Sequence, residues 1–135
     1  MIDKLTSALQ FQQQALALRQ QRQETLASNI ANADTPNYKA QDFNFATALK
    51  RATASQTGPV PLAKTHSGHL SLSNAHQAPV AMQYRVPAQS RLDGNTVDME
   101  MERAHFLDNS LRYQADIQFL DDRITGLRKA MQPEQ

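Results

Sequence analysis

The sequence of 135 residues has no cysteine, no tryptophan and few other aromatic residues, 6% of the total. Without cysteine the chain can form no disulfide, no thiolate metal site and no cysteine nucleophile. The formal net charge is +1, which argues against an extended basic surface, so we expect no nucleic-acid partner. No apolar run approaches membrane-spanning length, and the first residues lack the apolar core and cleavage site of a signal peptide. No cleaved signal peptide is therefore expected.

Few residues are arranged for catalysis. His66 and His69 have a spacing that could chelate a metal, but they lie in a Ser/Gly stretch without a cysteine or acidic partner, which favours solvated loop residues. Asp98, Glu100 and Glu102 fall on different faces of an expected helix start, where they suit the helix dipole better than acid–base work. No phosphate-binding loop or nucleophile motif occurs. We predict neither enzyme activity nor a cofactor or metal, and a loop site at the two histidines is the enzymatic alternative.

Heptad patterns at both ends of the chain predict two long helices. Residues 2–33 contain no glycine or proline, and their apolar residues follow 3-4 spacing. A second pattern runs from Met99 to Met131, with Asn95 as its expected N-cap. We expect these helices to pair with each other as an antiparallel coiled coil, or with copies of each other, in a mostly α fold. The predicted helix-pair interface comprises Leu9, Leu16, Leu26, Ile30, Phe106, Tyr113, Ile117, Leu120, Ile124 and Leu127.

Between the helices the sequence predicts an irregular middle. Residues 41–52 contain alternating phenylalanines followed by the spacing of a short helix. Residues 53–79 are rich in Ser, Gly and Pro, which indicates a flexible loop. The alternation from Val80 to Val86 predicts a short, half-buried β segment. The expected organisation is an N-terminal coiled-coil helix in 1–35, a middle segment in 36–95 and a C-terminal coiled-coil helix in 96–135.

The first helix is expected to stop within residues 28–38, S-N-I-A-N-A-D-T-P-N-Y. The residue before a proline is disfavoured in a helix, so Thr35 before Pro36 marks the exit. Asparagine side chains can bond free backbone groups at a helix end, and Asn37 suits the positive φ of a tight turn. An ordinary surface cap and turn is the simpler interpretation. The candidate residues of this stop are Asn29, Asn32, Thr35, Pro36 and Tyr38.

Two stretches carry a resemblance to a known family. A-S-N-I-A-N-A-D-T-P-N-Y, residues 27–38, resembles the N-terminal signature of the flagellar rod and hook protein family and departs from it at Asn37, where glycine is usual. L-D-G-N-T-V-D-M-E-M-E-R, residues 92–103, and F-x-x-N-S-L-R-Y-Q, residues 106–114, are similar to the C-terminal signature of a short family member from the proximal rod. Other rod members share the first signature but not the second. Further similarities to this member are Y-R-V-P, residues 84–87, and F-Q-Q-Q-A-L-x-L-R, residues 11–19.

The resemblance implies a structural subunit of the bacterial flagellar basal body. Such a subunit would pass through the flagellar type III export apparatus without a cleaved signal and stack helically around the export channel, where it would help to transmit motor torque. Its location would be the rod within the periplasm. Implied partners are copies of itself, other rod proteins, the rod–ring junction protein and the inner-membrane ring. The five stop residues would set an assembly elbow between inner helix and outer segment. A soluble coiled-coil adaptor or export chaperone is the alternative.

Overall fold

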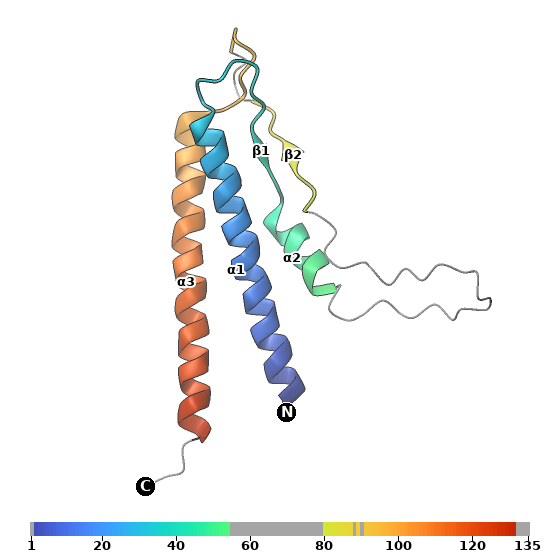
Figure 1. The fold of residues 1–135 in the computed structure, drawn as a ribbon, viewed down its shortest axis with the longest axis vertical. Helices are drawn as coiled ribbons and strands as arrows, with labels where there is room; N and C mark the ends of the chain where they lie inside the picture. Colours follow the sequence, from blue (N-terminus) through green and yellow to red (C-terminus); the bar gives the residue numbers. More distant parts are fainter. Residues whose placement is uncertain (1, 55–79, 88, 90, 132–135) are drawn as a thin grey trace, which may run out of the picture.

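The computed structural model describes residues 2–54, 80–87, 89 and 91–131. Within these ranges the chain forms helices α1 (Ile2–Ala31), α2 (Phe45–Ala54) and α3 (Met99–Met131), and strands β1 (Gln41–Asp42) and β2 (Gln83–Tyr84) (Figure 1). This confirms the expectation of a mostly α fold with long helices towards both ends. It also confirms a short helix and a short β segment between them.

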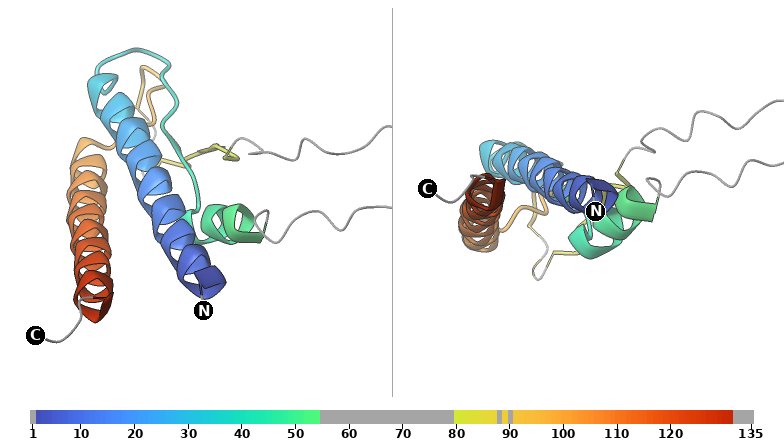
Figure 2. Two further views of the ribbon diagram at one scale, coloured as in Figure 1. Left: turned by 60° about the horizontal axis from the view of Figure 1, so that its bottom comes forward. Right: turned by 90° about the horizontal axis from the view of Figure 1, so that it is seen from below.

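The two long helices pack against each other in antiparallel directions. Their register is clear from side-chain contacts, because Asn29 near the end of α1 bonds Glu102 near the start of α3, whereas Arg19 pairs with Asp116 further along. α3 lies on one side of α1, and α2 and the sheet lie on the other (Figures 1 and 2). α1 is therefore the central element, with contacts to α2, α3 and β1.

Local sequence explains the ends of the long helices. α1 contains no glycine or proline and ends shortly before Pro36. α3 begins after Asp98, whose Oδ1 accepts hydrogen bonds from the N–H groups of Glu100 (3.1 Å) and Met101 (3.2 Å). Asp98 is thus the N-cap of α3, and the expectation of Asn95 in this role is wrong. The Asn95 side chain instead bonds the chain that follows α1.

The predicted β segment is shorter than expected and turns its apolar side outward. β1 and β2 pair antiparallel, with Gln41 opposite Tyr84. Tyr84 and Val86 are 70% and 94% exposed, whereas Arg85 between them is partly buried. The alternation therefore marks an extended segment correctly, but an arginine occupies the inward side. The reason is that Arg85 forms ion pairs with Asp42 and with α3.

The short middle helix is capped by its own sequence. Asn44 Oδ1 accepts a hydrogen bond from the Thr47 N–H at 3.0 Å, which fixes the start of α2. α2 extends two residues into the range expected to be a loop. The remainder of that range, residues 55–79, lies outside the described residues, as do His66 and His69.

The interior is small and depends on polar side chains. A cluster of small apolar residues, Ala33, Ala40 and Val97, fills the region where α1 ends. Buried polar groups must find hydrogen-bond partners, so buried amides and carboxylates specify which elements meet. The largest side chains that are no more than 1% exposed are Leu26, Asn29, Asn95, Glu102 and Asn109.

Candidate functional site

Two turns from distant parts of the chain interlock where α1 ends. We call them together the elbow, residues 28–40 and 91–97. Two of the bonds between them join backbone groups on both sides and a third joins a backbone N–H to a side chain, so the match requires a defined conformation of each turn. They run from the Asn37 N–H to the Asp93 carbonyl (2.9 Å), from the Thr96 N–H to the Tyr38 carbonyl (3.0 Å) and from the Ala40 N–H to Thr96 Oγ1 (2.8 Å).

Asn95 anchors the end of α1 from 60 to 63 positions downstream. Its buried side-chain amide donates to the carbonyls of Asn32 (3.1 Å), Ala33 (2.8 Å) and Thr35 (2.9 Å). Its Oδ1 accepts a hydrogen bond from the Val97 N–H at 2.7 Å. Carbonyls at the end of a helix lack partners within it, and this one side chain adds a bond to each of three that also accept from Thr35 N–H, Arg91 and Tyr38 N–H.

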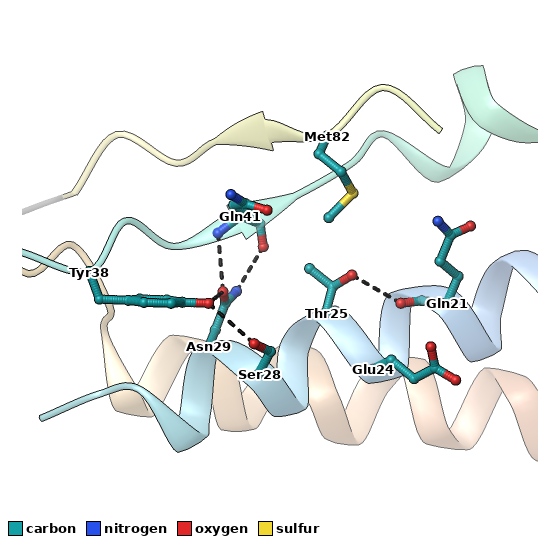
Figure 3. Close-up of a pocket in the computed structure, with 8 residues that line it drawn as sticks. All are labelled: Gln21, Glu24, Thr25, Ser28, Asn29, Tyr38, Gln41 and Met82. Carbon is teal, nitrogen blue, oxygen red and sulfur yellow. Dashed lines mark hydrogen bonds between the residues drawn. The ribbon is translucent and has the colours of Figure 1, made fainter. Parts of the chain in front are cut away.

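Asn29 lies fully buried at the centre of the elbow. Its Nδ2 donates to the Gln41 carbonyl at 2.7 Å, and its Oδ1 accepts from the Gln41 N–H at 3.1 Å. The amide thus pairs with Gln41 as a neighbouring strand would. Tyr38 donates from its hydroxyl to the same Oδ1 at 3.3 Å, and the ring lies across the last turns of α1 (Figure 3). Nδ2 also reaches Glu102 of α3 at 3.1 Å.

Four charged residues continue this network beneath the elbow. Glu102 is buried and accepts from Arg85 Nη1 at 2.7 Å. The other Nη of Arg85 bonds Asp42, which also receives a two-point contact from Arg22 at 3.0 and 2.9 Å. Burial raises the pKa of Asp42, but hydrogen bonds from Arg22 and Arg85 outweigh it and hold that pKa below its usual value. The network joins α1, β1, α3 and the segment after β2.

Two residues with positive φ face each other in the elbow. Asn37 has a φ of 61° and Gly94 a φ of 74°. A Cβ on Gly94 would lie 2.6 Å from Asn37 Oδ1, closer than atoms can approach. Position 94 therefore favours glycine because of its positive φ, and a larger residue would also displace the end of the exposed Asn37 side chain.

The structure brings the five predicted stop residues into this one region. Asn29 and Tyr38 lie at its centre, as described above. Asn32 Nδ2 donates to the Ser28 carbonyl at 2.8 Å, and Thr35 Oγ1 donates to Asn32 Oδ1 at 3.2 Å. Pro36 is exposed at the outer side of the turn.

The predicted helix-pair residues are placed less uniformly. Leu26 is buried, while Ile117 and Ile124 are 44% and 43% exposed. The α3 face towards α1 instead carries Asn109 and Asp116. Asn109 donates to the carbonyl of Arg19 at 2.9 Å, and Asp116 forms an ion pair with the Arg19 side chain. The partly buried members of the predicted set are Leu9, Leu16, Ile30, Phe106, Tyr113, Leu120 and Leu127.

Sequence reasoning missed the polar residues that join the elements. Arg85 could have been recognised as a buried contact residue because it lies at the centre of an apolar alternation. Glu102 could have been recognised because it shares one heptad face with Asn109 and Asp116. Asn95 follows an Asp-Gly turn, and its role depends on a distant helix end, so no local pattern could reveal it.

The described residues contain no group of three or more His, Asp or Glu side chains placed to hold a metal ion. No helix among them is both long and apolar enough to cross a membrane. The interactions found in this site are hydrogen bonds, ion pairs and close packing. Such an arrangement holds a shape and joins segments.

Comparisons with known proteins agree with this arrangement. A family model described as "Flagella basal body rod protein" matches residues 7–39, which include all but the last residue of the first turn of the elbow. The chain is 49% identical over 135 residues to the flagellar basal body rod protein FlgB of Salmonella typhimurium and 48% identical to that of Escherichia coli, with 98% of each chain covered. It is 47% identical over 129 residues to the FlgB of Aeromonas hydrophila, with 95% covered. The chain therefore belongs to the FlgB family of flagellar basal body rod proteins.

Proposed function

We propose that the chain is a structural subunit of the proximal flagellar rod, where it polymerises helically around the export channel and helps to transmit motor torque. The observation that carries this proposal is the identity of 49% to a FlgB rod protein across 98% of both chains. The match includes both turns of the elbow and both long helices. An assembly role is also consistent with a site built from hydrogen bonds and ion pairs.

The elbow would set the angle between the helix pair and the middle segment, residues 36–95. A subunit that carries torque needs a stiff joint, and buried, fully paired polar networks rigidify a fold. Asn29, Asn32, Thr35, Pro36 and Tyr38 would fix this joint. The predicted helix-pair residues would be buried within the subunit or against its neighbours. Partly exposed members such as Ile117 and Ile124 suit the second role.

Further parts of the proposal concern location and partners. The chain would be exported by the flagellar type III apparatus without a cleaved signal and would lie in the rod within the periplasm. Its neighbours would be copies of itself, other rod proteins, the rod–ring junction protein and the inner-membrane ring. Neither a cofactor nor an enzymatic activity is part of this role.

Purified flagellar basal bodies provide the test. The chain is expected to remain with the rod and ring after washing with detergent and high salt, in a constant ratio to other rod proteins. Deletion of its gene should leave cells without complete rods, and the intact gene should restore them. If the chain is instead found as a folded helical protein in the cytosolic fraction, the rod role fails and the adaptor or export chaperone takes its place.

A further inference from the structure

The second turn of the elbow contains the pair of residues at which aspartate isomerises most readily, Asp93 followed by Gly94. The backbone nitrogen of the residue after an aspartate can attack the carboxyl carbon of that aspartate. Glycine has no side chain to obstruct the approach, and it adopts backbone conformations that other residues avoid. Asp93 is exposed, so water can reach the reacting atoms. No other glycine in the sequence follows an aspartate or an asparagine.

The reaction rearranges the backbone without changing its mass. The Gly94 nitrogen forms a bond to Asp93 Cγ and gives up its proton, and a hydroxyl of the protonated carboxyl group leaves as water. A second water molecule then opens the five-membered succinimide. Attack at Cγ restores aspartate, whereas attack at the former backbone carbonyl carbon breaks its bond to the Gly94 nitrogen and gives isoaspartate. Water is the only co-reactant.

The closed elbow, in which the two turns interlock, occupies the groups that this reaction uses. The Gly94 N–H donates to the Arg91 carbonyl at 3.1 Å, and Asp93 Oδ1 accepts from the Asn95 N–H at 3.1 Å. The Asp93 carbonyl accepts from the Asn37 N–H at 2.9 Å, a bond that comes from the other turn. The attacking nitrogen and the attacked carboxyl group are thus each held by another partner.

The backbone of the turn also keeps the two reacting atoms apart. The bond from Gly94 to Arg91 closes a β-turn with Leu92 and Asp93 at its centre, and neither central residue has a positive φ. These features define a type I turn, in which ψ of the second central residue is about 0°. At that ψ the Gly94 nitrogen lies beside the backbone nitrogen of Asp93, whereas ring closure requires it to lie beside Cβ.

We propose that Asp93 is a site of spontaneous isoaspartate formation in chains whose elbow is open, and that closure of the elbow suppresses the reaction. In the product the backbone runs through Cβ and Cγ, which lengthens it, and the former Asp93 carbonyl becomes part of a free carboxylate. The Asn37 N–H then loses its acceptor, and Gly94 is displaced from its place opposite Asn37. Isomerised chains would therefore be unable to close the elbow. This chemistry is independent of the proposed rod function.

The test compares the purified full chain at neutral pH in buffer and in denaturing urea. A methyltransferase specific for isoaspartyl carboxylates measures the isoaspartate, and fragmentation of the tryptic peptide 92–103 locates it. We expect isoaspartate to accumulate at position 93 in urea and at least about tenfold more slowly in buffer, because only transient opening exposes the site there. Gly94→Ala should slow the reaction in urea several-fold, since its methyl group obstructs the attack. The proposal is wrong if position 93 stays unchanged in urea, or if it reacts equally fast in both solutions.

Two matched variants locate the protection in the elbow. Asn95→Ala removes the side chain that bonds the end of α1, so in buffer its rate should approach the rate in urea. Asn44→Ala is the control, because it makes the same change at the start of α2 and should leave the protection intact. Circular dichroism is followed in parallel. Release of the site while the helices persist supports the proposal, whereas release only when the helices are lost, or equally by Asn44→Ala, overturns it.

The effect on the elbow is measured on chain that has been aged in urea and then returned to buffer. Hydrogen exchange at the Asn37 amide should be slow in chains that retain aspartate and fast in chains that carry isoaspartate. Equal exchange in the two forms would show that the elbow closes around isoaspartate, and this consequence of the reaction would then be wrong.

Discussion

At the scale of the residue, the elbow depends on two neighbours that each adopt a left-handed conformation. Asn37 reaches this conformation with a side chain, and Gly94 reaches it without one. Their proximity couples them, because the Asn37 amide occupies the space where a side chain on residue 94 would begin. A side chain at residue 94 would therefore require the exposed Asn37 amide to move aside.

Gly94→Ala is expected to destabilise the chain by at least about 1–2 kcal/mol, the cost of a left-handed alanine, with the contact to Asn37 added. Adding Asn37→Gly to the Gly94→Ala chain should recover the share of the lost stability that comes from the contact between the two side chains. The share that comes from the positive φ of residue 94 should remain. Urea unfolding of the natural chain, the two single variants and the double variant measures both contributions to the free energy of unfolding. Gly126→Ala is the matched control, because this helical glycine has open space around it and the change should stabilise by about 1 kcal/mol. Equal losses in the single and double variants would show that the two turns are not coupled.

Asp42 makes stability depend on pH in the acid range. Its pKa is lower in the folded chain than its unfolded value of about 3.9, so its stabilising effect is complete above about pH 5 and declines as pH falls through the folded value. Asp42→Asn should lower the free energy of unfolding by roughly 2 kcal/mol at pH 7, because Arg22 and Arg85 lose a charged partner. The difference between the two proteins should narrow below pH 4. A difference that stays constant from pH 7 to pH 2.5 would contradict this role.

At the scale of the element, the pairing of α1 and α3 combines a few leucines with buried polar side chains. Asn109 is fully buried, yet its Oδ1 has no hydrogen-bond partner in the described part of the chain. Such a group costs stability, and a buried asparagine within a helix pair is known to fix register at that cost. We therefore expect Asn109 and Arg19 to fix the register of this pair.

Asn109→Leu should raise the thermal midpoint of unfolding, since it removes an unpaired buried oxygen and adds apolar surface. It should also broaden the set of helix pairings, which light scattering would detect as dimers or larger species of the purified chain. Gln114→Leu provides a control on an exposed position of the same helix. If Asn109→Leu lowers the midpoint and leaves the chain monomeric, the asparagine contributes stability and does not set register.

The long helices and their antiparallel pairing could be predicted from sequence because heptad spacing is local information. Which face of α3 contacts α1 was harder to predict from the sequence. Position 117 carries isoleucine and position 116 aspartate, so apolar spacing favours Ile117, whereas the structure turns Asp116 towards Arg19. This partly buried ion pair depends on a residue almost a hundred positions away, and hydrophobic periodicity contains no such information.

The elbow was predictable in part for the same reason. Proline and asparagine spacing marked where α1 stops, and Asn37 does have the expected positive φ. The side chain of Asn95 bonds the end of α1, and this role depends on backbone carbonyls in the turn that follows α1. Local propensity assigned Asn95 to the nearest helix start, where Asp98 in fact serves.

At the scale of the whole molecule, the elbow joins the helix pair to the middle of the chain. We expect Asn32→Ala combined with Pro36→Ala to prevent rod assembly while export continues. Asn32 loses its bonds to Ser28 and Thr35, and residue 36 loses the ring that restricts φ, so the joint becomes flexible. Export and assembly are read separately, as the amount of chain outside the cytoplasm and as motility in soft agar.

Asp34→Ala is the matched control for this double variant, because Asp34 is an exposed residue of the same turn. It should leave both readouts unchanged. Normal swimming by cells with the double variant would count strongly against the elbow as an assembly joint. Loss of export as well as motility would instead indicate that these residues are needed before assembly.

The anchor of α1 by Asn95 has a consequence for the order in which the molecule can form. The carbonyls of Asn32, Ala33 and Thr35 bond the Asn95 side chain, which lies 60 to 63 positions later in the chain. In a chain that emerges N-terminus first, the two turns of the elbow cannot interlock until residues 91–97 have emerged. A chain truncated before residue 91 would lack every hydrogen bond that joins the two turns of the elbow.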